Sequence, residues 1–171
     1  MQRLFLSLAL LLGISGCATT SSPLPEGYKG PTAIIKDSVI SLGPQKANFF
    51  FVSTVDGKKV ENSLIKTRQV NYGRGLHMTP ELIERQVAIQ PTVITIVGRT
   101  EYAAPILALT NDVYEVKGEI SFTPVENRTY SVYGELDENN SAVWLEDESD
   151  HKVIGNKIEI QGSAKLGIFE K

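Results

Sequence analysis

Few side chains in this chain are of the types that carry out chemistry in proteins. There are two histidines, His77 and His151, and a single cysteine, Cys17. A zinc site or a general base needs several His, Cys or acidic groups at defined spacing, and no His-x-x-x-His or His-x-x-Glu-His pattern occurs. The sequence therefore predicts no metal, no cofactor and no catalytic residue.

The acidic run Glu146–Asp150 offers oxygen ligands of the kind that calcium prefers. It lacks the Asp-x-Asx-x-Asx-Gly spacing and the distal Glu of an EF-hand loop, so we expect a solvated hairpin turn there. No Gly-x-Ser-x-Gly pattern marks a serine nucleophile. Gly73-Arg74-Gly75 is not followed by a lysine in the strand-to-helix frame of a phosphate-binding loop.

The stretch before the single cysteine gives that residue a role. Arg3 is followed by an apolar run over residues 4–13, and then by Ile14-Ser15-Gly16 and Cys17. The apolar run is too short to cross a bilayer as a helix, which takes about 20 residues, but it fits the h-region of a secretory signal. Residues 1–17 resemble the lipobox signal of bacterial lipoproteins.

The resemblance implies cleavage between Gly16 and Cys17, a diacylglycerol thioether on the Cys17 sulfur, and acyl chains such as palmitate holding the protein in the membrane lipid. The next residue is Ala18 rather than Asp, which in lipoproteins of Gram-negative bacteria favours the outer membrane, facing the periplasm. The alternative is an ordinary signal peptide with a chance cysteine. Lipidation accounts for a lone cysteine that cannot form an internal disulfide.

Three segments follow from this interpretation. Residues 1–16 are the signal peptide, residues 17–31 are the lipidated cysteine and a flexible tether, and residues 32–171 are one domain. Small, polar, Pro and Gly residues dominate the tether, which fully extended reaches about 45 Å. The full chain has a net charge of −3, which gives no support to a nucleic-acid partner.

From Thr32 onward the chain reads as a series of short strands. Apolar and polar residues alternate strictly over residues 114–122 and again over 130–136, and Tyr-x-Val-x-Gly occurs in both. Further strands are predicted at residues 32–42, 46–55, 87–97, 141–146 and 157–160, and Asp56-Gly57 predicts a hairpin. We expect strand and loop over 61–72, a short helix beginning at Thr79-Pro80, and an apolar loop or short strand over 101–111.

This pattern indicates an all-β fold, an antiparallel β-sandwich with little helix. The stretch over residues 46–55 is apolar on both faces, which predicts a central strand covered on both sides. The passages 130–136 and 142–147 resemble small immunoglobulin-like or transthyretin-like domains of bacterial lipoproteins. That resemblance implies a sandwich and names no activity.

Trp144 is the one aromatic residue whose place in a strand poses a clear choice. It alternates with Val143 and Leu145, so either the tryptophan or the aliphatic pair faces the core. One interpretation is a buried tryptophan. The other is an aromatic platform with Tyr133 or Tyr102 that binds a sugar or a partner protein.

Taken together, these features favour a lipid-anchored cell-envelope lipoprotein, held by acylated Cys17, that is a non-catalytic binding or scaffold module for another envelope protein. The first alternative is a carbohydrate-binding or peptidoglycan-binding module. The second is an envelope hydrolase whose site residues lie far apart in sequence. Fold class alone does not choose among these functions.

Overall fold

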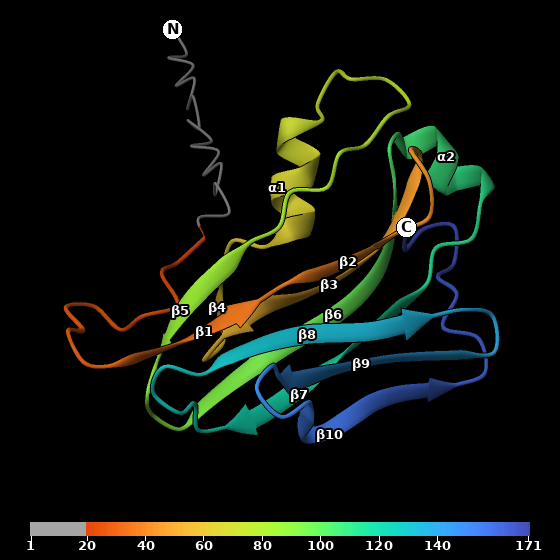
Figure 1. Ribbon diagram of the computed structural model, residues 1–171. Coiled ribbons are helices and arrows are strands. Elements are labelled where there is room, and N and C mark those ends of the chain that lie inside the picture. The colour runs from red at the N-terminus through yellow and green to blue at the C-terminus, as the bar shows by residue number, and fades with distance from the viewer. Residues whose placement is uncertain (1–19) are drawn as a thin grey trace, which may run out of the picture.

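The computed structural model describes residues 20–171, and its two packed sheets confirm the predicted β-sandwich (Figure 1). Residues 1–19, including the predicted cleavage site and Cys17, lie outside the described part. The strands are β1 (Thr32–Lys36), β2 (Ser38–Ser41), β3 (Lys46–Val55), β4 (Lys58–Lys59), β5 (Glu84–Ala88), β6 (Thr92–Tyr102), β7 (Glu115–Phe122), β8 (Thr129–Leu136), β9 (Asn140–Asp147) and β10 (Lys152–Gln161). The helices are α1 (Ser63–Val70) and α2 (Pro105–Thr110).

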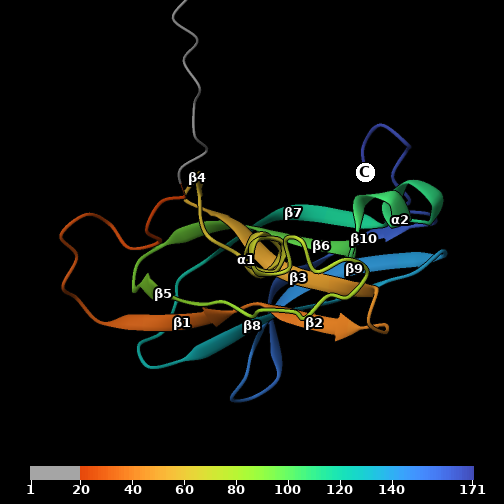
Figure 2. The ribbon, with the colours of Figure 1, turned by 90° about the horizontal axis from the view of Figure 1, so that it is seen from above.

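The strands form one sheet in the order β10-β9-β8-β1-β5 and another in the order β2-β3-β6-β7, with β4 paired to β3. Neighbouring strands are antiparallel except β1 and β8, which are parallel. The predicted strand over residues 32–42 is divided at Asp37, where the chain passes from one sheet to the other. Figure 2 shows β1 and β2 following one another along one side of the molecule.

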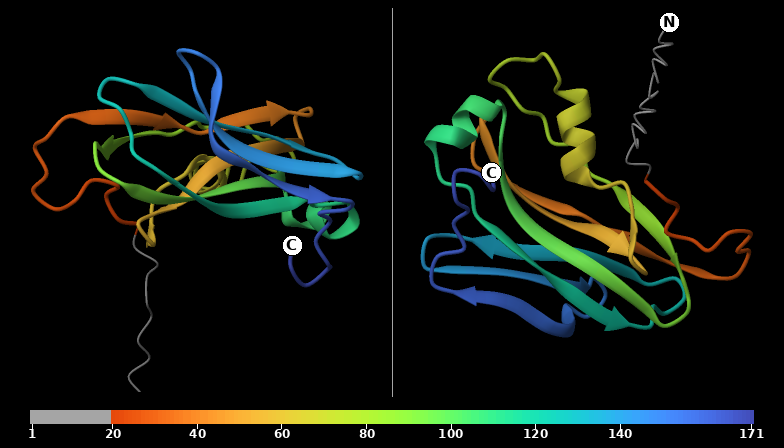
Figure 3. Two further views of the ribbon diagram at one scale, coloured as in Figure 1. Left: turned by 90° about the horizontal axis from the view of Figure 1, so that it is seen from below. Right: turned by 180° about the vertical axis from the view of Figure 1, so that it is seen from behind.

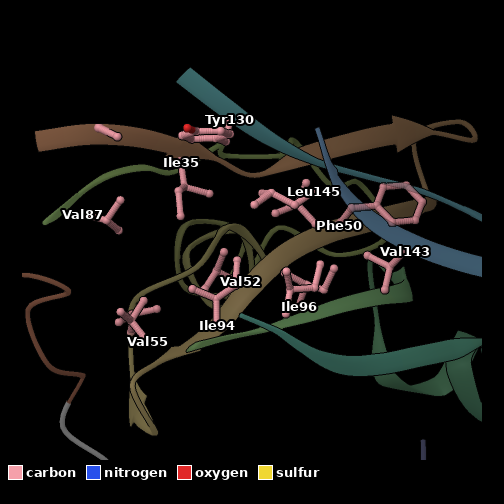
Figure 4. Close-up of a cluster of buried hydrophobic side chains, with 14 of the residues drawn as sticks. Ile35, Phe50, Val52, Val55, Val87, Ile94, Ile96, Tyr130, Val143 and Leu145 are labelled. Atoms are coloured by element: carbon pink, nitrogen blue, oxygen red, sulfur yellow. The ribbon is translucent and has the colours of Figure 1, made fainter. Parts of the chain in front are cut away.

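The main hydrophobic core fills the space between the two sheets. Figure 4 shows Ile35 and Leu145 from one sheet lying opposite Val52 and Ile96 from the other. These four side chains are completely buried. Burial of each such side chain stabilises the fold by about 1.5–3 kcal/mol.

A second apolar cluster lies on the outer face of β3 and confirms that this strand is covered on both sides. Phe50 faces the main core, whereas Phe49 and Phe51 pack with Leu64 of α1 and with Val97. The helix therefore covers the part of the sheet that would otherwise expose two phenylalanine rings. Both helices stand on the same side of the sandwich (Figure 3).

The prediction of strand and loop over residues 61–72 was wrong, because α1 occupies most of this segment. Only Leu64, Ser63 and Thr67 of the helix are buried, so its apolar periodicity is weak. The helix begins where the Asn62 side chain accepts the N–H of Ile65 at 3.1 Å, which is an N-cap. Capping and tertiary packing form this helix, and neither appears in the apolar pattern.

The helix predicted at Thr79-Pro80 was also wrong, because the chain there runs without a helix toward β5. The Asn71 side chain holds it, accepting the N–H of Thr79 at 2.9 Å and donating to the Thr79 carbonyl at 2.8 Å. The Thr79 carbonyl, which would accept the first hydrogen bond of a helix capped by Thr79, is thus bonded to Asn71 instead.

The segment over residues 101–111 also differs from the expected loop or short strand. Its first two residues, Glu101 and Tyr102, complete β6, and Pro105 begins α2. Proline is well suited to the first helical position, because the missing N–H has no partner there. A proline would break a helix that ran through it, but Pro105 lies at the start of α2 and is compatible with it.

The repeated Tyr-x-Val-x-Gly pattern has a packing reason at both sites. A side chain at Gly134 of β8 would overlap the ring of Phe50, and one at Gly118 of β7 would lie 2.6 Å from Ile158 of β10. Glycine lets the opposing side chain pack directly on the backbone.

A buried ion pair joins the two layers where the chain changes sheets. Arg85 donates to both carboxylate oxygens of Asp37, at 2.7 and 2.8 Å, and the two side chains are 4% and 0% exposed. The same carboxylate accepts the N–H of Val52 at 3.1 Å and both the N–H and the hydroxyl of Ser63, at 2.8 and 2.9 Å. Asp37 therefore holds β3, β5 and the start of α1 together.

We predict that Asp37→Asn lowers the free energy of unfolding by about 3–5 kcal/mol, because the Arg85 guanidinium stays buried without its counter-ion. This corresponds to a melting temperature lower by about 10 °C. Glu84→Gln, at an exposed position of β5, is the control and should change the melting temperature little. Thermal unfolding followed by circular dichroism measures both, and an unchanged melting temperature for Asp37→Asn would contradict the prediction.

Candidate functional site

A groove of about 650 Å³ lies between the two helices and the end of β6. α1 and the loop after it form one wall, and α2 forms the other. Its lining residues from these walls include Thr67, Arg68, Asn71, Tyr72, Met78, Pro105, Ala108 and Leu109. The lining residues come from several separate segments of the chain. The sequence analysis therefore did not identify this groove.

The rim of the groove carries exposed apolar side chains. Tyr72 is 92% exposed and Leu109 is 53% exposed, and both line the groove. Ile106 on α2 and Leu76 in the loop after α1 are also exposed. Apolar side chains gathered beside a concave surface are typical of a site that contacts another molecule.

Arg68, Arg99 and Lys171 are the cationic residues that line the groove. Arg68 donates to both oxygens of Glu101 at 2.7 Å, and the hydrogen bond to Glu101 raises the pKa of Arg68 against the opposing effect of burial. Arg99 forms an ion pair with Glu115, and its Nε atom is buried without a hydrogen-bond partner in the described residues. Both guanidinium groups are thus fixed in position by carboxylates.

Tyr102, one of the three aromatic residues proposed as a platform, lies at this groove. Its hydroxyl donates to the carbonyl of Asp112 at 2.9 Å, and Lys46 Nζ is 5.6 Å from the centre of its ring. Burial, with the nearby charge of Asp112, raises the pKa of the Tyr102 hydroxyl. Tyr102 is on the sheet opposite to the one that carries Trp144.

The other two aromatic residues do lie together. Tyr133 of β8 is directly opposite Trp144 of β9 in the register of the strands, and Tyr133 is 37% exposed. Val143 and Leu145 are completely buried, so the aliphatic pair faces the core and the partly buried Trp144 lies on the outer face. The structure therefore brings Tyr133 and Trp144 together and separates Tyr102 from them.

Polar contacts already engage much of the Trp144 indole. Lys157 Nζ lies 3.9 Å from the ring centre, which is a cation–π contact over one face. The indole N–H donates to Glu146 at 3.2 Å, and the other oxygen of Glu146 is 2.9 Å from Nδ1 of His151. A sugar ring stacked here would have to use Tyr133 and the free part of the indole.

The acidic run forms the predicted hairpin turn between β9 and β10, with Ser149 and Asp150 exposed, but its first part is not solvated. Asp147 is 5% exposed, and its carboxylate accepts bonds from Ser149 and from Arg128 at 2.9 Å. Burial raises the pKa of Asp147, but these bonds outweigh burial and leave that pKa below its ordinary value. Across residues 20–171, no three His, Cys, Asp or Glu side chains gather as metal ligands would.

Comparison of the chain with protein-family models, curated proteins and solved structures found no match. Within the described residues, no helix has the length and apolar character needed to cross a membrane. The function is therefore inferred from the sequence pattern and from the two surfaces described above.

We predict that acid destabilises the end of the sandwich where β9 leads into β10, through Glu148. The hydroxyl of Ser131 at 2.6 Å and Lys36 at 3.0 Å hold the pKa of Glu148 below its ordinary value, against the effect of burial. A carboxyl group with a lowered folded pKa stabilises the protein above its unfolded pKa of about 4.3, and this contribution is lost as pH falls through the folded pKa.

The melting temperature should therefore fall as pH decreases from about 5 to about 3. Ser131→Ala should lower stability by about 1 kcal/mol at neutral pH and flatten this dependence, because it removes the main bond to the ionised carboxylate. Glu119→Gln, at an exposed position of β7, is the control and should leave the pH dependence unchanged. A Ser131→Ala profile parallel to that of the wild type would contradict the assignment.

Proposed function

We propose that this protein is a bacterial cell-envelope lipoprotein, anchored in the outer membrane by acylated Cys17, whose domain binds another envelope protein without catalysis. The lipobox pattern at residues 14–17 supports the anchor. The groove between α1 and α2, with Tyr72 and Leu109 exposed on its rim, is the observation that carries the binding function.

The chemistry of the groove suits a protein segment with an apolar side chain next to a hydrogen-bond acceptor. The apolar side chain would pack between Tyr72 and Leu109, and tyrosine is among the residues that most often anchor protein interfaces. Arg68 is 53% exposed, and its bonds to Glu101 use only two of its five N–H donors. The other three donors have no hydrogen-bond partner within residues 20–171 and can bind a carbonyl or carboxylate of the partner.

A carbohydrate-binding or peptidoglycan-binding role is the second candidate. It is supported by Tyr133, which is exposed beside Trp144 on the outer face of the other sheet. Glu146 and His151 supply hydrogen-bonding groups at the same place. Lys157 covers one face of the indole, which makes this surface a weaker candidate than the groove.

Photo-crosslinking in intact cells tests the first proposal. A benzophenone amino acid in place of Tyr72 should give a reproducible adduct with one envelope protein, because this exposed ring borders the groove. The same amino acid in place of Tyr133 is the matched comparison, since it replaces an exposed tyrosine on the other surface. Protein adducts at Tyr133 alone, or none at either position, would overturn the groove as the binding site.

The same cells test the anchor. Growth with an alkyne-tagged palmitate should label the wild type but not Cys17→Ser, because the substitution removes the acylated sulfur. A wild type that takes up no label, or equal labelling of the two, would overturn lipidation at Cys17. Recovery of the wild type with the inner membrane would overturn the location alone.

Binding of the purified lipoprotein to insoluble cell wall tests the second candidate. It predicts that Trp144→Ala lowers binding about tenfold, the equivalent of about 1.4 kcal/mol of stacking and hydrogen bonding. Tyr72→Ala removes an aromatic ring from the other surface and should leave this binding unchanged. Equal binding by wild type and Trp144→Ala would eliminate the aromatic platform.

A further inference from the structure

The first described residues are attached to the domain. The N–H of Ser21 donates to the carbonyl of Lys59 in β4 at 2.7 Å. Pro23 and Leu24 are partly buried, and this segment borders a shallow groove shared with Val60 and Ile83. The chain is thus held against the domain beside the β3–β4 hairpin.

A second contact follows a few residues later. The hydroxyl of Tyr28 accepts the N–H of Ile89 at 3.3 Å and donates to the carbonyl of Pro31 at 2.8 Å. The stretch that its composition predicts to be a flexible tether is therefore attached to the domain at two points, Ser21 and Tyr28.

These contacts shorten the distance available between the lipid and the domain. With acylation of Cys17, on which this inference rests, only the chain from Cys17 to Ser21 is left to span that distance. Its fully extended length is about 14 Å, compared with about 45 Å for the whole predicted tether. A span of about 14 Å keeps the hairpin close to the headgroup layer.

We propose that the domain lies against the membrane through the β3–β4 hairpin and that its partner there is an anionic lipid surface. Lys58 and Lys59 are both exposed on β4. Asp56 and Gly57 form the tip with positive φ angles of 48° and 75°, and the Asp56 carboxylate accepts the N–H of Val93 at 2.9 Å. Each lysine near an anionic surface contributes about 1 kcal/mol of attraction.

This orientation directs the candidate binding groove away from the bilayer. Both α2 and the β8–β9 turn lie at the opposite end of the strands from the β3–β4 hairpin (Figures 1 and 2). A hairpin on the membrane therefore leaves α2 and the adjoining groove open to a partner in the aqueous compartment.

Fluorescence quenching on vesicles of phosphatidylethanolamine and phosphatidylglycerol tests this orientation. The full lipidated chain carries a dye at Val93→Cys, an exposed position beside Asp56 that keeps both lysines, or, as the distal comparison, at Asn139→Cys in the β8–β9 turn. The quencher is attached to lipid headgroups, and the acylated Cys17 takes no dye. We expect quenching at position 93 to exceed that at position 139 by about twofold or more, because a short span holds the hairpin near the surface.

Ser21→Pro removes the N–H that binds Lys59, whereas Ser21→Ala keeps it. Quenching at position 93 should fall in Ser21→Pro and stay at the wild-type level in Ser21→Ala. Vesicles without phosphatidylglycerol should reduce quenching at position 93, because Lys58 and Lys59 then lose their anionic partner, and unchanged quenching there would overturn the anionic surface. Equal quenching at both positions in protein that floats with the vesicles would overturn the orientation, whereas protein that fails to float would instead overturn the lipid anchor.

Discussion

The buried ion pair between Asp37 and Arg85 is the constraint on which the rest of the structure depends. A buried carboxylate is costly unless its lone pairs are satisfied, and here the donors come from three different elements: β3, α1 and β5. Because Asp37 lies where the chain changes sheets, one side chain fixes both the crossing and the start of α1. The helix that forms a wall of the groove is positioned by the same charge that joins the layers.

A strand could be predicted from the sequence where its own residues form a recognisable pattern of apolar and polar side chains. Over β7 and the second half of β8, more buried residues alternate with exposed ones, so alternation along the sequence reveals these strands directly. Helix α1 was not predictable in this way, because it depends on an N-cap, on Asp37, and on the rings of Phe49 and Phe51 that it covers. These partners lie elsewhere in the sequence, and only the folded chain brings them together.

The candidate sites show the same limit. The alternating pattern correctly placed Trp144 on the opposite face of its strand from its aliphatic neighbours, but it did not determine which face is buried. It also did not show that Tyr102 lies on the other sheet. The groove depends on Arg68 and Glu101, which are 33 positions apart and carry no mutual pattern in the sequence. A site built from one helix, one strand end and a distant second helix becomes visible only when their packing is known.

The segment next to the proposed anchor shows why composition is a poor guide to the reach of a tether. Its small, polar and proline residues have no face to bury, which is why they predict a free chain. A bond from the N–H of Ser21 to the carbonyl of Lys59 requires no such face, because it joins backbone to backbone at the edge strand β4. With Cys17 acylated, the distance from the membrane is then set by the first backbone contact and not by the number of residues before the first core strand. In the proposed orientation, a single edge hydrogen bond therefore links the position of the lipid to the direction in which the groove opens.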